Sequence, residues 1–106
     1  MRNLNPVILQ AGLKEALTKG GIVEAHCLED ASKVGSTWIG DWRIYLRSGD
    51  QTVLLVIQRT LEPRELKTIV GLISLGVELG LTTVGVPLKK GEKATWTYGA
   101  ETSLQS

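Results

Sequence analysis

Apolar residues near the start of the chain recur at the spacing of a helix, at Leu9, Leu13, Ala16 and Leu17. Asn5 and Pro6 precede them. An asparagine side chain can accept hydrogen bonds from free backbone amides, and a proline at the first helical position loses none. Gly20 and Gly21 follow, and glycine is the residue that most often ends a helix. We therefore expect a first helix that starts at Pro6 and ends before Gly20.

The pattern then changes to alternation of apolar and polar residues, which has the period of a β-strand. Alternation over residues 22–29 predicts a short strand, one side of which holds Val23, Ala25 and Cys27. Residues 30–37 are polar and contain glycine, so we expect a loop there.

A clearer strand, over residues 38–47, has one mainly apolar side and one mainly polar side. The apolar side holds Trp38, Gly40, Trp42, Ile44 and Leu46. The polar side holds Ile39, Asp41, Arg43, Tyr45 and Arg47. Residues 48–50 have turn chemistry, and residues 52–58 carry branched aliphatic side chains on both sides, as a central strand requires. These segments predict a hairpin with one face in the core.

The second helix is predicted to start at Glu62 and Pro63 and to end at Gly80, and its apolar residues form two ridges. The first ridge spans about 100° of arc and is expected to pack on the sheet. It holds Leu66, Ile69, Val70, Ile73 and Val77. The second ridge lies on nearly the opposite side and holds Leu72, Leu75 and Leu79. Such a helix needs to be covered on two sides.

The second ridge leads to a prediction of self-association. A chain of this size supports one modest core, which leaves little to cover a second apolar ridge. Gly71 and Gly76 cost roughly 1 kcal/mol each relative to alanine, so they indicate close approach by another backbone, unless they are merely tolerated. The first helix is an alternative cover for the ridge. We predict a homodimer interface at Leu72, Leu75, Gly76 and Leu79.

The last apolar segments predict two further strands. Residues 81–86 are expected to form one strand, which ends at Pro87. Residues 94–98 are expected to form the other, because an alanine and two aromatic residues alternate there with two threonines. Residues 99–106 lack periodicity and are expected to be a frayed tail. The chain, residues 1–106, is thus predicted to be a single α+β domain. It has two helices and a twisted, mainly antiparallel five-stranded sheet, in the order α-β-β-β-α-β-β.

Composition agrees with one ordinary globular domain. The chain has 106 residues, of which 42% are hydrophobic and 22% charged, and its net charge is +1. This balance excludes disorder by composition, and it removes the field that drives non-specific binding to nucleic acid or anionic lipid. No apolar run is long enough to cross a bilayer, no secretory signal pattern opens the chain, and a single cysteine cannot form an internal disulfide. We expect a cytoplasmic protein with no membrane partner.

Candidate chemistry is sparse. The one histidine and the one cysteine, His26 and Cys27, are adjacent, so on a strand their side chains point to opposite faces and cannot share a proton. They cannot supply the three or four ligands of a zinc site, and no glycine-rich phosphate loop precedes the second helix. Glu24 shares a face with His26, which allows either a carboxylate-oriented histidine or a surface pair without function. We predict no enzymatic activity, no metal and no cofactor.

One candidate binding site is a row of charged and aromatic side chains: Arg43, Tyr45, Arg47 and, at the far end of the partner strand, Arg59. Such a row can bind an anionic ligand, an acidic peptide or single-stranded nucleic acid through ion pairs and stacking. The alternative is a solvated sheet face whose arginines pair with Asp41 and Asp50.

The other candidate is a small apolar pocket lined by Trp38, Trp42 and Trp96. These tryptophans could equally pack beneath a helix.

The sequence leads to three hypotheses about function. The first is a non-enzymatic binding or adaptor module that acts as a homodimer, with a protein or small-molecule partner. The second is a nucleic-acid-binding regulator that uses the arginine row. The third is a small-ligand-binding protein with a tryptophan-lined pocket.

Overall fold

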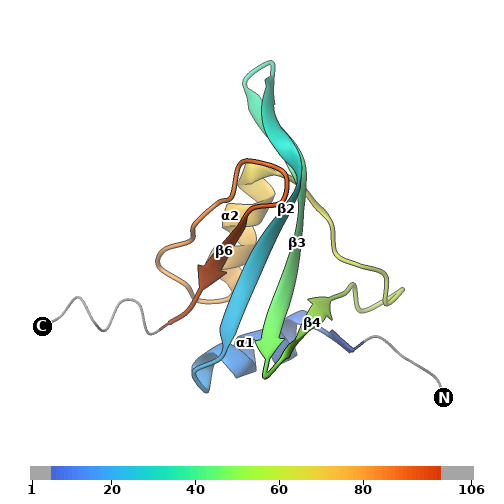
Figure 1. Ribbon diagram of the computed structural model, residues 1–106, viewed down its shortest axis with the longest axis vertical. Helices are drawn as coiled ribbons and strands as arrows, with labels where there is room; N and C mark the ends of the chain where they lie inside the picture. Colours follow the sequence, from blue (N-terminus) through green and yellow to red (C-terminus); the bar gives the residue numbers. More distant parts are fainter. Residues whose placement is uncertain (1–5, 99–106) are drawn as a thin grey trace, which may run out of the picture.

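A long antiparallel hairpin runs through the centre of the molecule, and its tip projects beyond the other elements (Figure 1). The computed structural model describes residues 6–98. Within them, the hairpin joins β2 (Ile22–Val34) to β3 (Thr37–Ser48). Gly35 adopts a φ of +65° in the connecting turn, a conformation that glycine reaches without strain. The strand expected over residues 38–47 is therefore confirmed.

The prediction of a loop over residues 30–37 is wrong, because most of these residues belong to the two strands of the hairpin. Register shifts between Cys27 and Glu29, and between Glu29 and Ser32, mark irregular pairing on the way to the tip. The projecting end is largely exposed on both faces, so the alternation that marks a half-buried strand is missing there.

The hairpin is the centre of a mixed sheet with the order β1-β4-β3-β2-β6. β1 (Val7–Ile8) lies parallel to β4 (Gln51–Leu55), and β6 (Lys93–Trp96) lies antiparallel to β2. β5 (Leu66–Thr68) pairs with the first half of β3. The α+β class, the mostly antiparallel sheet and the rough order of the main elements are as expected. β1 and β5 are additional short strands, whereas residues 81–86 form no strand.

The first helix, α1 (Gln10–Thr18), lies where the helical spacing placed it, but its start differs from the expectation. Leu9 is the N-cap residue, and Pro6 precedes β1. The Pro6 carbonyl accepts a hydrogen bond from a backbone amide of β4, so this part of the chain is used in sheet pairing. The cap expected at Asn5 and the tail expected over residues 99–106 lie outside the described residues.

The second helix, α2 (Ile69–Glu78), begins later than the proline at residue 63 indicated. Thr68 is its N-cap residue, and the Thr68 Oγ1 accepts a hydrogen bond of 3.0 Å from the Gly71 amide. Pro63 instead forms an isolated antiparallel bridge with Val56. A proline is compatible with a first helical turn, but a threonine side chain satisfies an amide that the helix leaves free. The helix therefore starts at the cap.

The leucine ridge of α2 faces the core of the protein itself. Leu72, Leu75 and Leu79 are each 0% exposed. Gly76 is buried beside them, and a Cβ there would overlap the side chain of Val84. The premise of an interface at Leu72, Leu75, Gly76 and Leu79 is therefore wrong, because the monomer covers this ridge without a partner.

The ridge that was expected to pack on the sheet faces outward instead. Val70, Ile73 and Val77 are 68%, 44% and 67% exposed, and these three residues are called the outer stripe below. Leu66 is buried, but it belongs to β5, and Ile69 is half-buried at the start of α2. The reversal has a steric reason, since the long leucine side chains fill the shared core and Gly76 leaves room for Val84 of the segment that follows α2.

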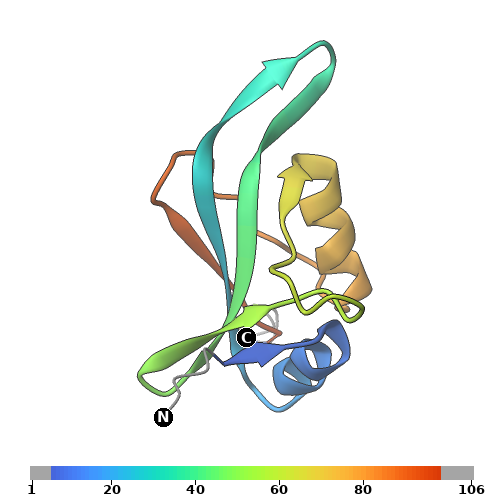
Figure 2. The same ribbon diagram turned by 90° about the vertical axis from the view of Figure 1, so that its right-hand side faces the viewer.

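Both helices lie on the same side of the hairpin (Figure 2) and share one core with it. The sheet side of this core contains Val23, Ala25, Cys27, Trp42 and Ile44, as the alternation predicted. No helix of the described chain covers the opposite side of the sheet, which is called the open face below. No described helix is long and apolar enough to span a membrane.

Candidate functional site

The open face brings polar side chains of two neighbouring strands together. In the antiparallel register of β2 and β3, Glu24 lies opposite Tyr45 and His26 lies opposite Arg43. Because side chains alternate along a strand, these residues and Arg47 all point away from the core. The predicted row of Arg43, Tyr45 and Arg47 is therefore present on one face.

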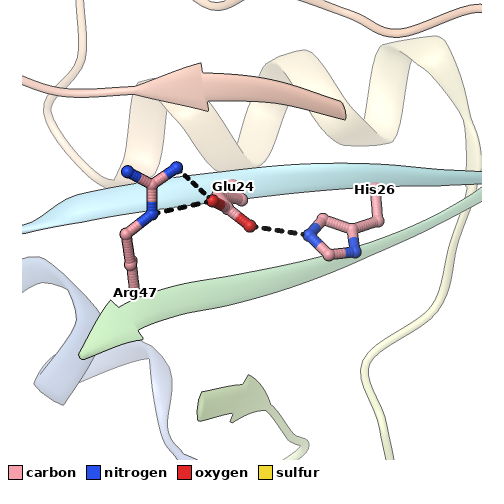
Figure 3. Close-up of polar contacts among 3 residues, drawn as sticks. All are labelled: Glu24, His26 and Arg47. Atoms are coloured by element: carbon pink, nitrogen blue, oxygen red, sulfur yellow. Dashed lines mark hydrogen bonds and ion pairs between the residues drawn. The ribbon is translucent and has the colours of Figure 1, made fainter. Parts of the chain in front are cut away.

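Glu24 is the centre of this group, although it is only 5% exposed. Its carboxylate accepts hydrogen bonds from His26 Nε2 at 2.9 Å and from Arg47 Nε at 2.9 Å, and it also contacts Arg47 Nη2 (Figure 3). The hydrogen bonds from His26 and then from Arg47 lower the pKa of Glu24 below its usual value, against burial, which raises it. The buried carboxylate is thus stabilised in its charged form.

The imidazole of His26 is held from two sides. Its Nε2 contacts Glu24, and its ring centroid lies 4.2 Å from that of Tyr45, with the two planes tilted by 35°. Cys27 points into the core, where its thiol donates to the Glu29 carbonyl at 3.0 Å, and burial raises its pKa. The thiol therefore cannot exchange a proton with His26, and the contact between Glu24 and His26 fits a structural pair.

A second set of ion pairs continues along the open face toward the hairpin tip. Arg43 Nη2 lies 2.8 Å from Glu65 Oε2, and Lys67 Nζ lies 3.3 Å from Asp41 Oδ2 and 3.4 Å from Glu65 Oε1. Arg43 lowers the pKa of Glu65, and Asp41 raises the pKa of Lys67. Arg43 and Arg47, the two arginines of the row that lie on β3, are therefore each paired with an acid.

The pairing differs from the expected one, in which the arginines met Asp41 and Asp50. Their partners are Glu65 and Glu24. Glu65 and Lys67 were missed because the sequence placed them inside the second helix, whereas they lie at β5. Arg59 lies in the turn at residues 58–60 and joins none of these ion pairs.

Two of the three tryptophans are buried in the core. Trp42 and Trp96 are 0% and 1% exposed, and their indole N–H groups donate to the backbone carbonyls of Pro87 and Gly85 at 2.7 and 2.8 Å. They fasten the irregular segment after α2 to the sheet. A pocket lined by all three tryptophans is therefore wrong, since only Trp38, at 48% exposure, is accessible.

Trp38 does line a cavity, of about 320 Å³, at the projecting half of the hairpin. The other lining residues are Ala31, Ile69, Leu88 and Lys89. The walls are thus mainly apolar and carry one cation.

The outer stripe is the other unusual surface. The ten residues of α2 include one charged side chain, Glu78, which accepts a hydrogen bond of 3.0 Å from Gln10 Nε2. A surface helix of a globular domain normally carries polar residues on its outer side. The outer side of α2 instead carries Val70 and Val77, each about two-thirds exposed at 68% and 67%.

Comparison with known family models, characterised proteins and solved structures finds no match for this chain. The described residues contain no group of three or more His, Cys, Asp or Glu side chains that could hold a metal ion.

Proposed function

We propose that this protein is a non-enzymatic binding module that forms a homodimer through the outer stripe of α2. The observation that carries the proposal is the exposure of Val70, Ile73 and Val77 on a helix with one charged residue. Exposed apolar side chains that lie together mark an association surface more often than scattered ones do. Association would remove them from water, at a gain of roughly 25 cal/mol per Å² of apolar area.

A second copy of the chain fits this surface better than a charged partner does. In a two-fold interface the same patch is present on both sides, so like charges at its centre would repel each other. The outer stripe has none, and Glu78 at its edge is held by Gln10. The spacing of three and four residues along the stripe is that of ridges in helix-to-helix packing. Ser74, between them, is small enough to permit close approach.

The open face gives less support to a nucleic-acid-binding role. Non-specific binding to phosphates requires cations that are free to replace counterions. Arg43 and Arg47 are already paired with Glu65 and Glu24, and the net charge of the chain is only +1. The arginine row is better explained as the ion pairs that stabilise an uncovered sheet face.

The test is the mass of the protein in solution at micromolar concentration, measured by sedimentation velocity. We expect a dimer for the unmodified chain and a monomer for the double variant Val70→Lys with Val77→Lys, because two lysines from each copy would meet at the interface. The control is Val34→Lys, which places a lysine at another exposed valine, on the hairpin. It is expected to remain a dimer.

Two results would count against the proposal. One is a monomeric unmodified chain. The other is a double variant that stays dimeric while its circular dichroism matches that of the unmodified chain.

A further inference from the structure

The cavity beside Trp38 is built from three segments that are far apart in the sequence. Ala31 and Trp38 come from the two strands of the hairpin, Ile69 opens α2, and Leu88 and Lys89 come from the segment before β6. This surface is separate from the outer stripe, so what it binds goes beyond the proposed homodimer.

The segment that contributes Leu88 and Lys89 is fixed to the hairpin by its backbone. The Ala31 amide donates to the Leu88 carbonyl at 2.8 Å, and the Lys90 amide donates to Asp30 Oδ1 at 2.7 Å. The wall of the cavity is therefore positioned before any ligand arrives, which reduces the ordering cost of binding.

The apolar part of the lining is unusually accessible. Trp38 and Leu88 are each 48% exposed, and Ile69 is half-buried next to them. An indole gives a large rigid surface on which an aromatic or aliphatic group can pack. A cavity of about 320 Å³ lies at the small end of the range found for ligand pockets, which indicates a small molecule.

Lys89 gives the cavity its charge. Arg43, Arg47 and Lys67 all form ion pairs with acids on the open face, whereas the ammonium of Lys89 pairs with no carboxylate in the part of the chain that the structure describes. Ile69 is the first residue of α2, so the positive end of that helix also lies at the cavity. Both contributions favour an anion.

We propose that this cavity binds a small carboxylate with an aromatic or aliphatic body. The body packs on Trp38, Leu88 and Ile69, and the carboxylate pairs with the ammonium of Lys89. Neither part alone would give selectivity, because an apolar wall accepts many bodies and a single exposed lysine accepts many anions.

The indole N–H signals in an NMR spectrum provide the test, with phenylacetate as the probe and phenylacetamide as its neutral counterpart. The chain has three tryptophans, and the variant Trp38→Phe identifies the signal of residue 38. We expect phenylacetate to move that signal and to leave the signals of the buried Trp42 and Trp96 in place. Phenylacetamide is expected to bind about tenfold more weakly, which is the typical value of one charge-assisted contact.

Two matched variants separate the role of Lys89 from that of general charge. Lys89→Gln is expected to weaken phenylacetate binding about tenfold and to abolish the preference over phenylacetamide. Lys90→Gln removes the same charge one residue away and is expected to leave both unchanged. The proposal is overturned if phenylacetate leaves the Trp38 signal unmoved at millimolar concentration. It is equally overturned if both lysine variants weaken binding to the same degree.

The same titration on the Val70→Lys, Val77→Lys variant keeps the two proposals apart. We expect that variant to bind phenylacetate as the unmodified chain does, because neither valine lines the cavity. Loss of the dimer with retained binding leaves the cavity proposal intact. Loss of binding in a folded variant overturns the claim that the cavity is a separate site.

Discussion

The two sides of α2 are made of the same kind of residue but have opposite environments. On one side, Leu72, Leu75 and Leu79 are completely buried. On the other, Val70 and Val77 are about two-thirds exposed, at 68% and 67%. Apolar character therefore identifies both ridges but does not show which one is buried. The longer leucine side chains fill the core, and Gly76 beside them accommodates Val84.

The largest expected effect comes from the buried side. Leu75→Ala removes a side chain that is 0% exposed and leaves a cavity between α2 and the sheet. We expect it to lower the free energy of unfolding by about 2–5 kcal/mol. Ser74→Ala, the adjacent exposed position, is expected to stay within about 0.5 kcal/mol. Urea unfolding at one fixed protein concentration measures both, and equal effects at the two positions would contradict the assignment of the sides.

The next largest effect tests the close approach at Gly76. A methyl group there would overlap Val84, so Gly76→Ala is expected to lower the free energy of unfolding by about 1–3 kcal/mol, although alanine is the better helix former. Adding Val84→Ala makes room for the methyl group. The double variant should therefore lose less free energy of unfolding than the two single variants do together. If the two losses are strictly additive, the glycine at residue 76 is not required by its contact with Val84.

The positions of the ridges could be predicted from the sequence, but their orientation could not. Periodicity detects both ridges of α2, and it identifies α1, β3 and the first part of β2 because each of these has one apolar side. The strongest indication of the true orientation was Gly76, which falls on the leucine side and not on the side of Val70 and Val77. A glycine on a packed helix face indicates where the backbone approaches its neighbour.

The contacts of the candidate site could also be predicted only in part from the sequence. The contact of Glu24 with His26 follows from alternation, since residues two apart on a strand share a face. The partners of the arginines depend on how the strands are aligned. Arg47 meets Glu24 across the register of β2 and β3, and Arg43 meets Glu65 only because β5 lies beside β3. No local pattern of residues carries this information.

A smaller effect is expected on the open face of the sheet, where polar contacts replace apolar packing. Glu24→Gln removes the charged acceptor of His26 and Arg47, and we expect a loss of about 1–2 kcal/mol, reduced by the solvent exposure of Arg47. Glu65→Gln breaks a similar pair with Arg43 at an exposed acid and is expected to cost less. Equal losses would show that burial of Glu24 adds nothing to its role.

The pH dependence gives the same residue a second test. The folded chain lowers the pKa of Glu24, so its contribution to stability is fully present above the pKa of the unfolded carboxyl group. That contribution decreases as the pH falls from there through the lower pKa of the folded state. Glu24→Gln should therefore show a shallower loss of stability in acid than the unmodified chain, as followed by thermal unfolding. An identical acid profile would contradict the pKa direction.

The smallest effect on folding is expected at the outer stripe, and it separates folding from association. Val70→Ser changes a side chain that is 68% exposed, and valine and serine have similar helix propensities, so the monomer should lose no more than about 0.5 kcal/mol. Its effect should appear in the concentration dependence of unfolding. A dimer is stabilised by mass action, so the melting temperature of the unmodified chain should rise with protein concentration, and that of the variant should rise less. Val34→Ser, at an exposed valine of the hairpin, should retain the full dependence. If both variants keep the slope of the unmodified chain, the outer stripe is not the surface through which the copies meet.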